Sequence, residues 1–231
     1  MKIRRLSTFF LLLLSFCSMG NAGVSEVKFV NAPSLESIPS TKTEVPMDGM
    51  TAALVYLDTL NSSERSEITK LNFSYYELSW DDVSSLCSFL SSNPNTVPNL
   101  QILDLSESKI FKNPKEHIGE LKNLVGLFDS RKKLIYIDIS NIVFRPVDES
   151  TEFKFISTDN LSPTEVRSFY GDYITLQEKV ASKDSSKTLV FMPSQIAYDL
   201  CEKKVFTADS KLSSLMRDQR RYYSNFCPSE Y

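Results

Sequence analysis

Three stretches of the chain repeat one pattern of apolar and polar positions. In residues 100–110 the apolar positions are Leu100, Leu103, Leu105 and Ile110, and the same spacing recurs in residues 68–78 and 134–144, with periods of 32 and 34 residues. Two polar columns recur with this frame: Asn72, Asp104 and Asp138, and then Ser74, Ser106 and Ser140. A repeat period of this size predicts an architecture of stacked units.

Each stretch leads into a segment with helical spacing. Ser79 and Asp82 predict a capping box ahead of the apolar stripe at Val83, Leu86, Cys87 and Leu90. Residues 113–128 and 162–180 repeat the device, each with a capping residue, a proline at the first helical position and a glutamate. The unit is therefore a strand, a short loop, a capped helix and a return loop. Strands joined in this way are expected to lie parallel, with the helices on one side.

The repeated phrase resembles the leucine-rich repeat, whose core is L-x-x-L-x-L-x-x-N/C-x-L. The long period with a full helix is similar to the ribonuclease-inhibitor-like branch of that family, and the resemblance covers residues 68–144. The family's Asn/Cys position holds Tyr76, Ser108 and Ile142 here, so the repeats are degenerate and their loops are expected to differ. The resemblance implies an α/β fold: a short solenoid with a parallel concave sheet, helices on the convex side and helical caps.

The flanking segments predict caps and weaker repeats. Residues 49–60 predict an N-terminal capping helix that buries Ala53, Val55, Tyr56 and Leu60, and residues 209–225 predict a C-terminal one. Strands are expected around Phe153 and Leu189. Only 16 residues separate Ile137 from Phe153, which leaves either a truncated repeat or a hairpin-like insertion. Residues 23–47 are expected to form an extended leader with one short strand, ahead of a repeat domain at 48–231 whose part after 144 is degenerate.

The first 22 residues predict a secretory signal peptide. Lys2, Arg4 and Arg5 precede an apolar run shorter than a bilayer span, and Gly20 and Ala22 hold the small-residue positions before the cut. A retained anchor and a lipoprotein signal are the alternatives. The protein is therefore expected to be exported, and to be secreted, periplasmic or bound at the cell surface.

Removal of residues 1–22 would leave 23 basic and 29 acidic residues, a net charge of −6. This balance argues against nucleic acid or an anionic membrane surface as the main partner, because both reward dense positive charge. No other apolar run approaches membrane length, so no membrane insertion is expected after signal removal. Of the remaining cysteines, Cys201 and Cys227 can pair, and Cys87 is expected as a buried thiol.

The sequence predicts no catalytic residues, no cofactor and no metal site. The single histidine, His117, has no serine or cysteine placed beside it by motif, and close zinc-ligand pairs and a phosphate-binding glycine loop are missing. Two carboxylates, Asp104 and Asp138, make a poor calcium site. Two alternatives to a binding protein stay open: a hydrolase-like enzyme with an unrecognised Asp/Ser/Lys site, and a structural envelope protein that self-associates through open repeat ends.

The main candidate for function is the sheet face opposite the helices. Because strand residues alternate between faces, this face is expected to carry Lys70, Asn72, Asp104, Tyr136, Asp138 and, on the next strand, Lys154. Asp104 is expected beside Asp138, with Lys154 offsetting their repulsion. We expect the face to bind a protein partner with a basic surface in a salt-sensitive manner, with Tyr136 as an anchor. The alternative is a solvated strand face.

A second candidate contact lies near the C-terminus. It is the basic cluster of Arg217, Arg220 and Arg221 beside two tyrosines on the predicted C-terminal helix. The alternative is a solvated helix end. The sequence leaves the oligomeric state open.

Overall fold

The structure is a computed structural model that describes residues 26–31, 44–47, 49–108, 110, 117–140, 144–146, 153–155, 163–192, 194–202 and 210–226. The predicted signal peptide, residues 1–22, lies outside the described residues, as does Cys227 with its proposed pairing to Cys201.

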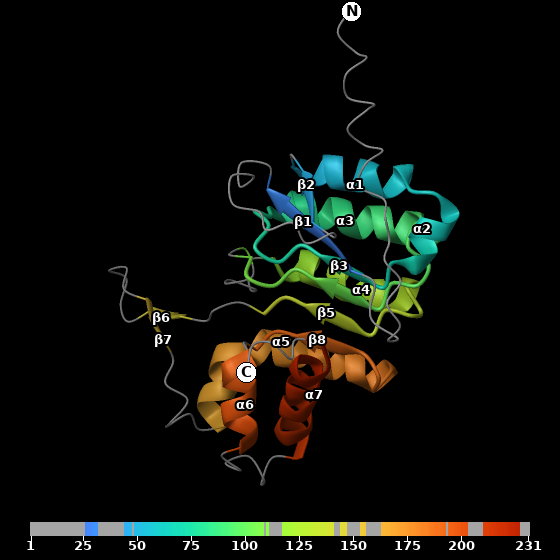
Figure 1. Cartoon of the computed structure of the whole chain (residues 1–231). Coiled ribbons are helices and arrows are strands. Elements are labelled where there is room, and N and C mark those ends of the chain that lie inside the picture. Colours follow the sequence, from blue (N-terminus) through green and yellow to red (C-terminus); the bar gives the residue numbers. More distant parts are fainter. Residues whose placement is uncertain are drawn as a thin grey trace, which may run out of the picture.

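A six-stranded parallel sheet forms the centre of the molecule (Figure 1). Its strands lie in the order β2 (Glu44–Met47), β1 (Glu26–Asn31), β3 (Lys70–Asn72), β4 (Ile102–Asp104), β5 (Tyr136–Asp138) and β8 (Thr188–Val190). The register aligns Leu71, Leu103, Ile137 and Leu189, as the repeat frame predicts, and places Asp104 beside Asp138. The predicted α/β class and parallel pairing are confirmed. The sheet is not curled, so a solenoid is not shown.

Helices form a layer along one face of this sheet. They are α1 (Gly49–Thr59), the short α2 (Ser62–Glu67), α3 (Trp80–Ser92), α4 (Ile118–Ser130) and α5 (Pro163–Lys183). In Figure 1 the strands lie in front of α3 and α4, which run alongside them. The capping box of α3 is present as predicted, because the Ser79 side chain accepts from the Asp82 N–H and the Asp82 carboxylate accepts from the Ser79 N–H. Helix α4 begins at Ile118, and the cap predicted at 113–116 lies outside the described residues.

Two further helices, α6 (Ser194–Glu202) and α7 (Ser210–Phe226), pack together at the β8 end of the sheet. Helix α7 buries Leu212, Leu215, Met216, Tyr222 and Tyr223, which confirms the predicted C-terminal helix and its buried residues. At the other end, α1 buries Met50, Ala53 and Leu57, whereas Val55, expected inside, is 57% exposed. The C-terminal cap also departs from the expectation that all helices share one side, since α7 reaches Tyr136 on the opposite face.

Two predictions about the flanking segments are confirmed only in part: the short strand expected at residues 27–30 lies within β1, and a strand forms at Phe153. Residues 23–47 are not merely a leader, because β1 and β2 pair within the main sheet and β1 lies directly beside β3. The strand at Phe153, β7 (Phe153–Phe155), pairs antiparallel with β6 (Phe144–Pro146) in a separate two-stranded sheet. The segment is thus a hairpin-like insertion, the second of the two alternatives, and β8 takes the place beside β5.

Basic side chains close the C-terminal ends of the helices. The Arg131 guanidinium is buried and donates to the carbonyl oxygens of Leu90, Asn93, Pro94 and Val97, at 2.6–3.1 Å, where α3 ends. The Lys187 ammonium donates to the Phe128 carbonyl near the end of α4. The last carbonyls of a helix have no partner within it and carry the negative end of its dipole, so a cation there satisfies both. At α3 and α4, the residues that follow the next helix thereby cap the helix before it.

Two glutamines close the outer edge of the last strand. The Gln177 side chain of α5 accepts from the Leu189 N–H at 2.6 Å and donates to the Lys187 carbonyl at 3.3 Å. The Gln219 side chain of α7 accepts from Phe191 N–H at 2.9 Å and donates to the Leu189 carbonyl at 2.8 Å. Unpaired edge groups are a template for another strand. The amides occupy them, so β8 ends the sheet.

We expect Gln219→Leu to lower the free energy of unfolding by about 2–4 kcal/mol, because it leaves buried backbone groups without partners. Urea denaturation at 25 °C measures the loss, and light scattering should show concentration-dependent association through the uncovered edge. Gln101→Leu is the matched control, since the Gln101 side chain makes no hydrogen bond with the described residues and is part-exposed. Equal stability of the two variants would contradict the edge-closing role.

Candidate interaction surface at the strand ends

The two repeated polar columns form one structural device at the ends of the strands. Asn72 Oδ1 accepts from the Ser74 N–H at 2.8 Å, Asp104 Oδ1 from the Ser106 N–H at 3.1 Å, and Asp138 Oδ1 from the Ser140 N–H at 2.8 Å. A short acidic or amide side chain that bonds the backbone two residues on builds a turn. The columns expected to face a partner therefore shape the turns that leave the sheet.

Backbone hydrogen bonds between units continue past the strands into these turns. Tyr75 N–H donates to the Ser106 carbonyl at 3.2 Å, and Glu107 N–H donates to the Ser140 carbonyl at 2.8 Å. Tyr75 and Glu107 have positive φ angles, 61° and 62°. With the side-chain acceptors, this ladder supplies hydrogen-bond partners to the turns beyond the strands.

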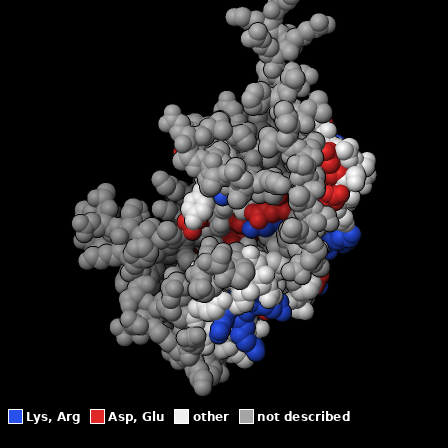
Figure 2. Space-filling model, viewed as in Figure 1, with Lys and Arg blue, Asp and Glu red and all other residues white. Residues whose placement is uncertain are grey.

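Charged residues alternate across the face opposite the helix layer. Lys70 Nζ lies 3.4 Å from Glu26 Oε1 on β1 and 3.2 Å from Asp104 Oδ2 on β4. The Asn72 amide also donates to the Glu26 carboxylate. In the view of Figure 2, acidic and basic side chains lie side by side near the middle of this face. The expectation that Lys154 offsets the carboxylates is wrong, since Lys154 belongs to the separate hairpin and Lys70 takes this role.

Asp138 lies at the buried end of this row and is only 2% exposed. Burial is the larger cause, and the negative charge of Asp104 the smaller one, that together raise the pKa of the Asp138 carboxyl to about 7. Hydrogen bonding from Ser140 opposes this rise only in part. Asp138 therefore differs from an ordinary surface carboxyl, because its neutral form is favoured below neutral pH.

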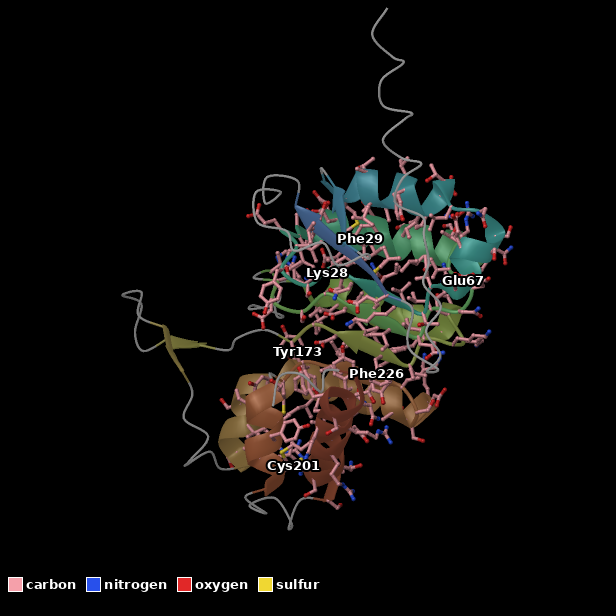
Figure 3. The ribbon with its side chains drawn as sticks, in the orientation of Figure 1. Lys28, Phe29, Glu67, Tyr173, Cys201 and Phe226 are labelled. Carbon is pink, nitrogen blue, oxygen red and sulfur yellow. The ribbon has the colours of Figure 1, made fainter. Side chains whose placement is uncertain are left out.

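Tyr136, the expected anchor for a partner, is covered by the protein's own C-terminal helix. Its ring centroid lies 5.1 Å from that of Tyr222 and 5.2 Å from that of Phe226, both on α7. Figure 3 shows Phe226 at the junction of α7 with the sheet. The structure thus brings together five of the six predicted face residues, and buries all five: Lys70, Asn72, Asp104, Tyr136 and Asp138.

The accessible residues of this region are those that follow the buried row. Tyr75 is 71% exposed, and Glu107 is partly exposed. Beyond the same strand ends, the Trp80 and His117 rings stack with centroids 4.4 Å apart at 20°. His117 Nδ1 is 3.8 Å from Glu120 Oε1. We call these four residues, Tyr75, Trp80, Glu107 and His117, the turn edge.

Sequence reasoning missed the turn edge, although one signal pointed to it. The position after each Asx-x-Ser triplet holds Tyr75, Glu107 and Asn141. Asn tolerates the left-handed conformation, whereas a tyrosine there is unusual. A bulky aromatic in a position that suits Gly or Asn is a mark of a role outside folding.

The second predicted contact is only partly assembled. Arg217 and Arg221 are exposed on α7, and Figure 2 shows basic side chains gathered there. Arg221 NH2 lies 3.6 Å from Asp218 Oδ1, and Arg220 stacks on the Tyr198 ring at 4.9 Å. Much of this cluster is therefore engaged within the α6–α7 pair.

Three other kinds of chemistry gain no support from the described residues. Within them, no three His, Cys, Asp or Glu side chains are grouped to hold a metal ion. None of the helices that the structure describes has the length and apolar character needed to cross a membrane. The Cys87 thiol is buried on α3, and burial raises its pKa to about 12, which disfavours the reactive thiolate.

No protein-family model matches the chain, no curated protein is similar to it, and no solved structure resembles it.

We expect Asp138→Asn to be more stable than the native protein at pH 8 by about 1 kcal/mol or more. The folded protein keeps the Asp138 proton up to about pH 7, whereas an unfolded Asp loses it near pH 3.9, so native stability falls as pH rises between these values. The variant removes this titration and retains Oδ1 as the turn acceptor. The difference, measured by urea denaturation, should disappear toward pH 4.

Asp184→Asn is the matched control. Asp184 Oδ1 accepts from Ser186 N–H at 3.0 Å in the same kind of turn, but its side chain is exposed and hydrogen bonds from Ser186 lower its pKa. Its substitution should therefore lower stability at neutral pH and matter less in acid. If both variants respond to pH in the same direction, the buried-carboxyl explanation fails.

Proposed function

We propose that this is an exported, non-catalytic binding protein, a short and degenerate relative of the leucine-rich repeat solenoids. It binds a protein partner at the side of its sheet opposite the helix layer, and the turn edge makes the contact. The observation that carries this proposal is Tyr75, a large aromatic side chain that is 71% exposed and held at a φ of 61°.

The conformation of Tyr75 supports a role in recognition. A non-glycine residue in the left-handed region costs about 1 kcal/mol or more, and the surrounding turn must enforce it. Here Asn72 supplies the turn acceptor, and the hydrogen bond to Ser106 fixes the Tyr75 backbone. The buried row therefore positions the turn edge, and the turn edge makes the contact. Exposed Tyr and Trp side chains are enriched among residues that dominate binding energy.

The charge beneath the turn edge favours a basic partner surface. The row carries the carboxylates of Glu26 and Asp104 against the ammonium of Lys70, and Glu107 adds a carboxylate at the rim. Asp138, with its pKa of about 7, adds negative charge only as the pH rises above neutral. Such a surface would attract Lys or Arg side chains, and exposed ion pairs weaken with salt.

The other readings of the sequence gain less from the structure. In the hydrolase-like alternative, Asp104, Asp138 and Tyr136 would line a pocket. In this structure they hold turns, an ion pair and helix α7. Self-association by strand addition at the C-terminal end is disfavoured because Gln177 and Gln219 occupy the edge of β8.

We expect Tyr75→Asn to bind the partner at least about tenfold more weakly, as loss of an aromatic hot spot does, while stability rises by about 0.5–1 kcal/mol. Partners captured from extracellular and surface fractions would be purified, and their affinity measured by calorimetry at two salt concentrations. Val55→Ala is the control, because Val55 on α1 is the other large apolar side chain that is exposed among the described residues. Unchanged affinity for Tyr75→Asn would overturn the turn-edge contact. A loss of stability would show that Tyr75 serves folding.

A further inference from the structure

A groove of about 270 Å³ lies on the helix layer, between α4 and α5. Its floor is apolar and its rim is basic. Val125, Phe128, Leu176 and Val180 supply the apolar surface. Five lysines and two aspartates also line it, a surplus of three positive charges in a chain whose net charge is −3. The sign of this surface is therefore opposite to that of the whole protein.

Each helix presents one stripe to the groove. On α4 the stripe is Lys122, Val125, Gly126 and Asp129, and on α5 it is Leu176, Lys179, Val180 and Lys183. Both stripes follow positions i, i+3, i+4 and i+7, so each covers about 10 Å of helix. The groove is thus two helical turns long, which suits a short segment of about seven residues if helical.

The groove already holds one carboxylate of the protein itself. Asp129 Oδ2 lies 2.6 Å from Lys183 Nζ, and its pKa is lowered by that hydrogen bond and by the charges of Lys183, Lys187 and Lys132. Lys122, Lys132 and Lys179 are exposed and make no hydrogen bond or ion pair with any described residue. The site therefore accommodates a carboxylate and retains three further cations for an external one.

We propose that the α4–α5 groove binds a short acidic segment of a partner protein, whose apolar side chains fill the floor and whose carboxylates face the lysine rim. Lysines act as adaptable point charges that suit scattered carboxylates. The apolar floor favours such a segment over a small inorganic anion. Two aspartates in the lining disfavour the dense charge of a nucleic acid. The site is separate from the turn edge and does not depend on it.

Gly126 gives a direct test because it lies in the groove with open space around it. A Cβ placed on Gly126 meets nothing within 4 Å, so Gly126→Leu should fill the groove without disturbing the helix. Gly171→Leu is the matched control: this glycine also has open space, and at 100° per residue it lies on a face of α5 away from the stripe. Circular dichroism and thermal melts would check that both variants are folded.

Charge variants test the rim. The probe is a fluorescent nine-residue peptide, EELEELLEE, with its KKLKKLLKK counterpart and phosphatidylglycerol vesicles as comparisons. We expect saturable binding of the acidic peptide below ~1 mM. Lys122→Glu with Lys179→Glu, and separately Gly126→Leu, should weaken it at least about tenfold. Lys211→Glu, an exposed charge reversal on α7, and Gly171→Leu should leave it unchanged. Asp129→Asn, which removes the internal carboxylate, should tighten it.

Three outcomes would overturn the proposal. They are no binding of the acidic peptide at 1 mM, equal weakening by Lys211→Glu and by the groove variants, and groove-dependent binding of the vesicles in place of the peptide. None of these outcomes concerns Tyr75, so a failure of the groove proposal would not affect the proposed turn-edge contact. A failure of the turn-edge proposal would likewise not affect the groove proposal.

Discussion

Backbone hydrogen bonding is the constraint on which this structure depends. Strands of three residues leave many backbone N–H and C=O groups to be paired from elsewhere. In each repeat a ladder cannot continue at the turn after the strand or at the end of the helix, and the last strand adds the outer edge of the sheet. Asn72, Asp104 and Asp138 serve the turns. Arg131 and Lys187 serve the helix ends, and Gln177 and Gln219 serve the edge.

This constraint explains why so many polar side chains lie inside a small protein. A buried polar group costs free energy unless it is hydrogen-bonded, and several of these side chains supply a bond that the backbone lacks. Arg131 is the clearest case, since its guanidinium links one unit to the end of the helix before it through five hydrogen bonds. The units are thus connected by polar caps as well as by apolar packing, which favours folding of the stack as one body.

The repeat pattern predicted what depends on periodicity. The spacing of Leu71, Leu103 and Ile137 predicted the register of three strands. The capping cues, Ser79 with Asp82 and Ser162 with Glu165, predicted the helices α3 and α5. The pattern did not predict the contacts that elements outside the repeat make with it. The frame could not show that β1 lies beside β3, nor that α7 crosses to cover Tyr136.

The sequence contains a signal for the two edge-closing glutamines, but the signal does not identify the backbone groups that they bind. Gln177 and Gln219 occupy positions in otherwise apolar helical stripes, three residues before Val180 and three residues after Met216. A polar residue at a buried position indicates a bond to be made, but the sequence does not say with which backbone group. The same holds for Asp104 and Asp138. Their alignment across the strands was predicted correctly, but their role was not. Their position suggested contact with a partner, whereas each accepts a hydrogen bond from the backbone N–H two residues later and so stabilises the turn.

Composition was a poor guide to recognition because charge is segregated by layer. The acidic balance of the chain suggested a basic partner, and the row beneath the turn edge agrees with that inference. The helix layer carries the opposite sign, since lysines from α4, α5 and the loops that follow them meet around one apolar groove. Lys122 and Lys183 are sixty-one residues apart in sequence and line the same groove only after folding. At physiological ionic strength charges act over about 8 Å, so a partner on either face responds to the local sign rather than the net charge.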